Sequence, residues 1–219
     1  IMEHIERTGV HSGDSITVYP TQTLSDETLK TIVTYTKTLA KALQILGLFN
    51  IQYVIDKNNK VYVIEVNPRA SRTVPILSKV TRIPMIKIGI NAILGTSLKE
   101  QGYGVGLLEE NGLVAVKVPV FSFQKLHKVD VALTPEMKST GEVLGVDSNY
   151  NYALTKAFIA SGHDFKMKGK IYVSLNTKDK TEAIPLIKGL QEKGYEFYAS
   201  TGTAEVFKAN GIKTHTLSK

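Results

Sequence analysis

The stretch Val61-Tyr-Val-Ile-Glu-Val-Asn-Pro-Arg-Ala-Ser-Arg72 decides the fold, because a run of apolar residues ends there in a carboxylate, an amide and two guanidiniums. Such a run predicts a buried strand that delivers polar groups at its C-terminal end. Side chains alternate across a sheet with a period of two, so Glu65 and Asn67 should share one face. Their oxygens suit Mg²⁺, which takes one or two carboxylates and completes its shell with water and substrate phosphates.

Two arginines follow the run directly. Pro68 ends regular strand pairing and turns the chain, and Arg69 and Arg72 come next. A guanidinium can hold a phosphate or carboxylate bidentately, so this segment is a candidate site for polyphosphate chemistry. The competing interpretation is an ordinary strand end whose arginines pair with surface carboxylates.

A hairpin places a further amide near this strand. The apolar run 47–55 is followed by the polar cluster Asp56-Lys-Asn-Asn-Lys60, which leads into the strand just described. Antiparallel pairing would set Gln52 beside Glu65, where its amide oxygen could reach the same cation. Gln52 could equally be an ordinary strand residue on a wet face.

The beginning of the chain carries a glycine- and hydroxyl-rich loop, Gly9-Val-His-Ser-Gly-Asp-Ser15. Its glycines allow unusual backbone conformations, and its amides and hydroxyls could wrap a nucleotide phosphate. A loop of this kind is more often a simple turn. The sequence has no Gly-x-x-x-x-Gly-Lys-[Ser/Thr] motif, which excludes the P-loop nucleotide hydrolases.

In this order, segments 9–15, 50–53 and 64–75 resemble the ATP-grasp core of the carbamoyl-phosphate synthase large subunit, and segment 134–145 resembles the part that closes this domain. Within the two homologous halves of that subunit, the arginine-bearing segment looks like the second, carbamate-phosphorylating half. The resemblance implies a nucleotide site, a metal site and a pair of catalytic arginines. It assigns the nucleotide to Gly9, Val10, His11, Ser12, Gln52 and Glu65, the Mg²⁺ or Mn²⁺ to Gln52, Glu65 and Asn67, and catalysis to Arg69 and Arg72.

The last fifty residues follow a different pattern. The runs 169–175 and 194–199 predict strands, and the apolar spacing within 181–193 and 204–209 predicts helices, so a parallel-sheet β-α-β-α unit is expected. It resembles the start of a methylglyoxal-synthase-like regulatory domain. By that resemblance an allosteric nucleotide phosphate would contact Ser174, Lys180, Ser200 and Thr203. The alternative is a helix-capping turn, because Ser and Thr are ordinary N-caps.

We therefore expect an α/β chain, with an α+β ATP-grasp portion over residues 1–160 and a partial regulatory domain over residues 161–219. Ser25 should cap a helix whose apolar stripe reaches Leu46 and which Gly47 ends. Further helices are expected over 84–94 and 150–160. The segment 102–106 looks like a loop.

The composition of the chain excludes several kinds of site and protein class. The chain has no cysteine, which excludes disulfides and a catalytic thiol and fits a reducing compartment. It has neither an apolar run of eighteen residues nor a signal pattern, so a cytoplasmic protein without membrane attachment is expected. The net charge of +7 is spread along the chain, which argues for anionic nucleotides rather than nucleic acid as partners.

The resemblance also implies partners and missing parts. It implies a glutaminase small subunit that supplies ammonia, an effector of the UMP or IMP class, and a bound K⁺. Arg7 stands where the family often has glutamine, so the potassium ligands stay unassigned. The chain resembles a piece that begins inside the ATP-grasp pattern and stops midway through the regulatory domain, so we expect it to be inactive alone.

Two other functions remain open. The first is a different ATP-grasp ligase, such as a biotin carboxylase or a peptide ligase, which would use the same arginines and strand. The second is a non-catalytic nucleotide-sensing module, in which only the turn at residues 200–203 binds ligand.

Overall fold

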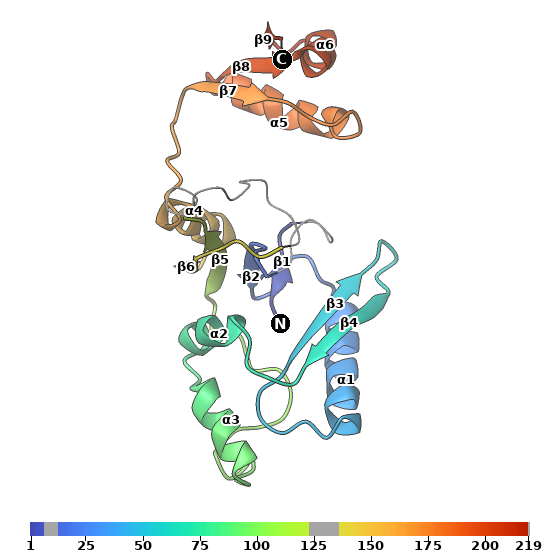
Figure 1. Ribbon diagram of the computed structural model, residues 1–219, viewed down its shortest axis with the longest axis vertical. Coiled ribbons are helices and arrows are strands. Elements are labelled where there is room, and N and C mark those ends of the chain that lie inside the picture. Colours follow the sequence, from blue (N-terminus) through green and yellow to red (C-terminus); the bar gives the residue numbers. More distant parts are fainter. Residues whose placement is uncertain (7–12, 123–135, 219) are drawn as a thin grey trace. The chain divides into compact units, whose positions relative to one another are not determined.

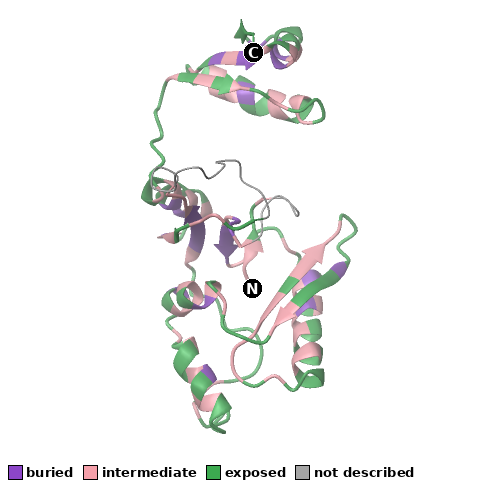
Figure 2. Cartoon of the chain, in the orientation of Figure 1, coloured by how far each residue is buried: buried purple, intermediate pink, exposed green. Residues whose placement is uncertain are grey.

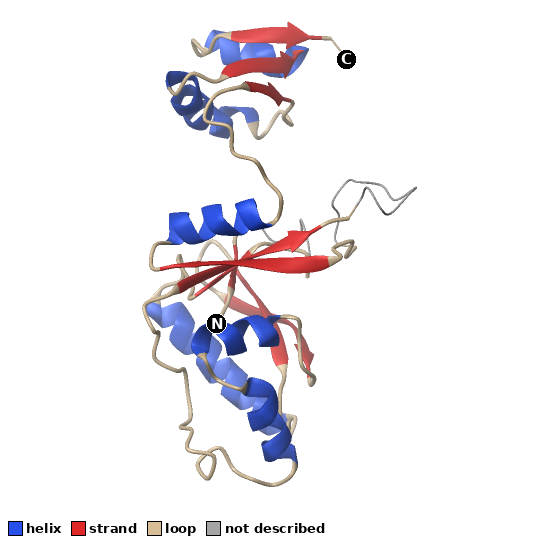
Figure 3. Cartoon of the chain, turned by 90° about the vertical axis from the view of Figure 1, so that its left-hand side faces the viewer, coloured by secondary structure: helices blue, strands red, loops and turns tan. Residues whose placement is uncertain are grey.

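The structure is a computed structural model that describes residues 1–6, 13–122 and 136–218 of the 219. The chain divides into two compact units, residues 1–163 and 164–219. Helices and strands are mixed in both units, which confirms the predicted α/β class (Figures 1 and 3). The elements described in the first unit are β1 (Glu3–His4), β2 (Thr17–Tyr19), α1 (Asp26–Ala42), β3 (Asn50–Ile55), β4 (Val61–Asn67), α2 (Thr73–Thr81), α3 (Met85–Ile93), β5 (Val114–Val120), β6 (Gly141–Asp147) and α4 (Tyr150–Ala160).

An antiparallel sheet with the order β1-β2-β5-β6 forms the centre of the first unit, and α4 lies across one of its faces (Figure 3). Asn149 begins α4, because its side-chain oxygen accepts from the backbone N–H groups of Asn151 and Tyr152. Ala153 and Ala157 of the helix pack against Val18, Val116 and Val118 of the sheet, and these five residues form one buried core (buried residues are purple in Figure 2). The helix 150–160 was predicted from the sequence, whereas strands β2, β5 and β6 were not.

Glycine is required where α4 meets β6. A Cβ atom added at Gly145 would lie 2.0 Å from the carbonyl oxygen of Ala153 and 2.4 Å from the backbone nitrogen of Ala157. Both atoms belong to the helix backbone, so no side-chain movement could make room. The absence of a side chain at Gly145 therefore sets how closely the helix approaches the sheet.

The hairpin β3–β4 forms a second, two-stranded sheet beside α1 (Figure 1). The hydroxyl of Tyr53 on β3 lies 2.8 Å from that of Thr36 on α1. The predicted antiparallel pairing is confirmed, but the prediction of a buried strand is wrong, because only Val61 of β4 is buried. A two-stranded sheet packed against one helix leaves the other side chains of β4 in contact with solvent.

Helix α1 ends earlier than the sequence predicted. Ser25 caps it as expected, accepting from the backbone N–H of Thr28, but the helix ends at Ala42. Gln44 takes a left-handed conformation at φ 50°, which ends the helix before Gly47. Leu46 is therefore exposed and does not extend the buried stripe.

The second unit consists of β7 (Lys170–Val173), α5 (Lys180–Glu192), β8 (Glu196–Ser200), α6 (Thr201–Ala209) and β9 (Thr214–Leu217). Its sheet has the order β7-β8-β9 with both pairs parallel. The β-α-β-α pattern predicted the parallel pair β7-β8, whereas β9 was not predicted. The core of this unit contains Phe197, Phe207 and Ile212. Parallel pairing brings the C-terminal ends of β7 and β8 to the same edge, where α6 begins.

Candidate functional site

Three oxygen-bearing side chains lie on one face of the hairpin. Gln52 of β3 is paired directly with Glu65 of β4, and Asn50 is paired with Asn67. The amide nitrogen of Asn67 donates to Oε1 of Glu65 at 2.8 Å, so the two side chains share one face as the period of two predicted. A β-bulge follows Gln52, where the register shifts before Tyr53.

This group fits a hard divalent cation by its chemistry. Gln52, Glu65 and Asn67 offer two amide oxygens and one carboxylate, and Gln52 and Glu65 are exposed, so water and phosphate oxygens can complete the shell. Across residues 1–6, 13–122 and 136–218, no cluster of three or more His, Cys, Asp or Glu side chains has metal-binding geometry. The hairpin group has a single carboxylate, so it needs a substrate phosphate to bind the metal well.

The two arginines differ in how they are held. Arg69 lies in the turn after β4, and its Nη1 donates to the neighbouring carbonyl of Ala70 at 3.0 Å. Arg72 stands at the N-cap of α2, and its Nη1 lies 3.2 Å from the hydroxyl of Ser139 and 3.5 Å from Oδ1 of Asp14. Arg69 is exposed and is held by its own turn, whereas Arg72 reaches groups that are distant in the sequence.

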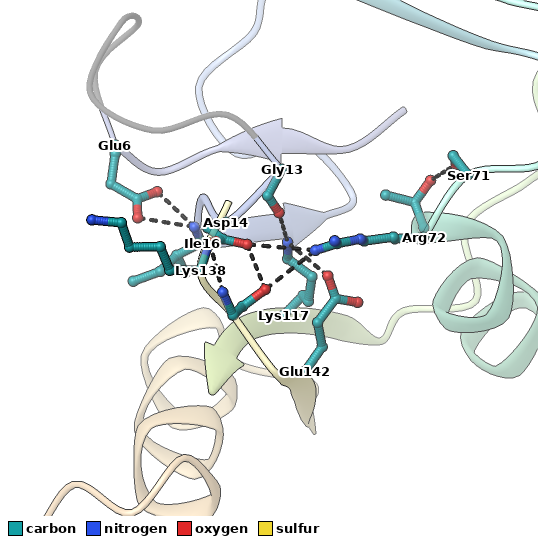
Figure 4. A network of polar contacts seen from close by, with 11 residues as sticks. Glu6, Gly13, Asp14, Ile16, Ser71, Arg72, Lys117, Lys138 and Glu142 are labelled. Carbon is teal, nitrogen blue, oxygen red and sulfur yellow. Dashed lines mark hydrogen bonds and ion pairs between the residues drawn. The ribbon is translucent and has the colours of Figure 1, made fainter. Parts of the chain in front are cut away.

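Asp14 is the centre of a polar network that sequence reasoning did not identify (Figure 4). Its Oδ2 accepts from the backbone N–H groups of Lys138 at 2.5 Å and Ser139 at 2.9 Å, and its Oδ1 accepts from the Ser139 hydroxyl at 2.5 Å. Burial opposes ionisation of Asp14, but these hydrogen bonds and the charge of Arg72 together lower its pKa. The carboxylate therefore stays ionised and ties two distant segments together.

A buried lysine lies beside the same network. Nζ of Lys117 on β5 donates to the carbonyl of Gly13 at 3.0 Å and lies 3.4 Å from Oε1 of Glu142 on β6 (Figure 4). Lys117 is almost completely buried, and a buried ammonium is tolerated only when it is paired. The backbone just before Asp14 is thus fixed to the central sheet.

The proposed nucleotide loop cannot be placed. Gly9, Val10, His11 and Ser12 lie outside the described residues, as does Arg7. Their assignment stays a prediction. The structure does describe Asp14 and Ser15 at the end of this loop, and both are buried.

In the second unit, the four residues predicted to hold a phosphate lie together. The hydroxyls of Ser174 and Ser200 are 3.1 Å apart, and Ser200 donates to the hydroxyl of Thr203 at 3.2 Å. Nζ of Lys180 donates to the carbonyl of Gly202 at 2.9 Å. Three hydroxyls and one ammonium therefore gather where β7 and β8 end and α6 begins.

The capping alternative explains this cluster less well. Ser200 occupies the N-cap of α6, yet its side chain makes no capping hydrogen bond to the helix backbone. Its hydroxyl instead contacts the other hydroxyls of the cluster. A helix N-terminus with uncapped N–H groups attracts anions. An added Cβ at Gly202 would lie 3.2 Å from Nζ of Lys180, so the end of that flexible side chain would have to shift by a few tenths of an ångström.

Comparison with known proteins gives consistent matches along the chain. Residues 2–101 match the family model of the carbamoyl-phosphate synthase L chain, ATP binding domain, and residues 182–219 match the MGS-like domain. The carbamoyl phosphate synthase large chain of Clostridium acetobutylicum is 58% identical over 218 residues, which cover 99% of this chain and 20% of that protein. The large chain of Caldanaerobacter subterraneus subsp. tengcongensis is 50% identical over 218 residues, with 100% and 20% coverage.

A solved structure is similar to this chain in fold. N5-carboxyaminoimidazole ribonucleotide synthetase from Thermotoga maritima aligns with a TM-score of 0.50 at 18% identity, over 67% of this chain and 44% of that one. At this identity the likeness concerns the fold alone. The curated relatives match the chain almost from end to end, although it spans only about a fifth of their length. The chain therefore belongs to the family of the carbamoyl phosphate synthase large chain.

Proposed function

We propose that the full-length protein containing this chain phosphorylates carbamate with ATP to form carbamoyl phosphate, and that the first unit carries part of that active site. The observation that supports this most is the grouping of Gln52, Glu65 and Asn67 on one hairpin face, followed at once by the two arginines. The names of the curated relatives, carbamoyl phosphate synthase large chains, agree with it.

In this reaction an oxygen of carbamate attacks the γ-phosphorus of ATP, the bond from that phosphorus to the β–γ bridging oxygen breaks, and ADP leaves. Both reactants are anionic, so the site must offset charge and hold them in line. A divalent cation held by Gln52, Glu65 and Asn67, Mg²⁺ or Mn²⁺, would neutralise charge on the β- and γ-phosphate oxygens. Arg69 and Arg72 would bind the carbamate or the transferring phosphoryl group.

The proposal includes several parts beyond the hairpin. Gly9, Val10, His11 and Ser12 would line the nucleotide, and K⁺ would bind nearby. A glutaminase small subunit would supply ammonia in the cytoplasm. No helix in the described part of the chain is long and apolar enough to cross a membrane.

The second unit would bind a regulatory nucleotide of the UMP or IMP class through its phosphate. The cluster of Ser174, Lys180, Ser200 and Thr203 supports this, because hydroxyls, an ammonium and a helix N-terminus together suit a phosphate. The match of residues 182–219 to the MGS-like domain agrees. We place the boundary between the catalytic and regulatory portions near residue 160.

A nucleotide-binding experiment distinguishes the proposed enzyme from a non-catalytic nucleotide-sensing module. In the full-length protein, ATP should protect against proteolysis of the first unit only when Mg²⁺ is present, and Glu65→Ala should abolish that protection. Protection that ignores Mg²⁺ and is lost in Lys180→Ala would instead favour a sensing module. A full-length protein that turns over ATP with another acceptor and not with carbamate would identify a different ATP-grasp ligase.

A further inference from the structure

We infer that Asp14 is the positioning residue for Arg72, acting both directly and through Ser139, and that it sets the direction in which the guanidinium meets the carbamate-derived substrate. The inference rests on the proposed function of Arg72. It concerns a residue whose partners lie 124 and 125 positions away in the sequence, in the Lys138–Ser139 segment.

The first support is an asymmetry of burial. The side chain of Asp14 is 3% exposed and that of Arg72 is 51% exposed, so the carboxylate is the fixed member and the guanidinium is the member that needs fixing. A half-exposed arginine has several rotatable bonds and would otherwise sample many rotamers. Asp14 is held by three hydrogen bonds from Lys138 and Ser139, and Lys117 holds the preceding carbonyl of Gly13.

The second support is a hydrogen-bond relay. Nη1 of Arg72 donates to the hydroxyl oxygen of Ser139 at 3.2 Å, and that hydroxyl donates to Oδ1 of Asp14 at 2.5 Å. Because the Ser139 hydroxyl gives its only proton to Asp14, its lone pairs are left to accept from the arginine. An uncharged residue at position 14 would not fix the direction of this hydroxyl in the same way.

The third support is that the network leaves two guanidinium nitrogens of Arg72 available to a substrate. Among the residues that the structure describes, only Nη1 of the Arg72 guanidinium makes a hydrogen bond or an ion pair. The distance of 3.5 Å to Asp14 is also longer than that of a strong bidentate pair. The guanidinium is thus held at one end, while Nη2 and Nε can donate to an anion.

The test uses the full-length protein and the reverse of the proposed reaction, the transfer of phosphate from carbamoyl phosphate to ADP, measured as ATP formed. Asp14→Asn should lower kcat/KM for carbamoyl phosphate by about ten- to a hundredfold and leave the KM for ADP nearly unchanged. Ser139→Ala should act in the same direction with a smaller loss, and Ser139→Thr, which restores a hydroxyl, should recover activity.

A matched control is available in the same segment. Thr140→Ala removes the next hydroxyl, which contacts Ser122 and the carbonyl of Val120 rather than Arg72, and should leave all the constants unchanged. The double variant Asp14→Asn with Arg72→Ala should be no slower than Arg72→Ala alone, because both changes remove one function. If the activity losses of the two single variants multiply in the double variant, Asp14 acts independently of Arg72 and the inference is wrong.

Failure of the inference and failure of the proposed function give different results. If the unaltered protein forms ATP and Asp14→Asn forms it equally well, or raises only the KM for ADP, the role of Asp14 is wrong and the proposed reaction stands. If the unaltered protein forms no ATP from carbamoyl phosphate, the proposed function fails, and the inference that depends on it fails too.

Discussion

Replacement of Gly145 by alanine should open the first unit at the contact between β6 and α4. The added Cβ would lie 2.0 Å from the carbonyl oxygen of Ala153, so the helix must move by about 1.4 Å to reach ordinary contact. Such a movement separates Ala153 and Ala157 from the valines of the sheet core. Overpacking of this kind costs about 3 kcal/mol, since backbone atoms cannot rotate away.

Native-state hydrogen exchange on the full-length protein is the appropriate assay, because a multidomain protein has no single unfolding free energy. Amides of β6 and α4 should exchange roughly a hundredfold faster in Gly145→Ala. Gly141→Ala is the matched control, because it lies on the same strand and its Cβ would meet nothing within 4 Å. Equal exchange in the two variants would refute the packing of α4 against β6.

Three further predictions concern the sites. Replacing Arg69 or Arg72 by Lys keeps the charge and loses the fork, so carbamate-dependent kcat should fall by about ten- to a thousandfold in the full-length protein while the melting temperature stays unchanged; a collapse of the melting temperature would mark these arginines as structural. Lys180→Ala and Thr203→Ala should each remove the response of the ATP saturation curve to UMP or IMP, a coupling of about 1 to 3 kcal/mol, with unregulated turnover retained; if both variants still respond, the effector binds elsewhere. The pKa of Asp14 is lowered by folding, so its contribution to stability is present above about pH 4 and is lost as pH falls further. Hydrogen exchange at pH 7 should therefore separate the wild type from Asp14→Asn, with the difference shrinking near pH 3, and a difference that grows on acidification would contradict this sign.

Local signals in the sequence predicted the hairpin and its pairing. Two apolar runs joined by a polar turn indicate two adjacent strands, and the period of two then fixes which side chains share a face. This is why the pairing of Gln52 with Glu65 could be expected before the structure was known. The helix 150–160 was equally predictable, because Asn149 is a strong cap.

Other elements lack a signal of this kind. Strand β5 is buried along nearly its whole length, so its sequence shows no alternation, and Lys117 and Pro119 interrupt its apolar run. The early end of α1 depends on the left-handed conformation of Gln44, which its residue type does not favour.

The network around Asp14 could not be predicted for a different reason. Its carboxylate joins residues more than a hundred positions apart, and no periodicity links such segments. The sequence does offer one signal, a carboxylate between glycine and serine in a loop that the fold later buries. Burial of a charged residue depends on tertiary packing, which a pattern of neighbouring residues does not reveal.

The most direct test of the central claim is carbamate-dependent ATP turnover of the full-length protein with Mg²⁺, compared between wild type and Glu65→Gln. Glutamine keeps the shape and removes the only carboxylate of the proposed metal group, so turnover should fall by at least about a hundredfold. Glu109→Gln, which alters an exposed carboxylate in the loop between α3 and β5, should leave turnover unchanged. Near wild-type turnover in Glu65→Gln would contradict the account.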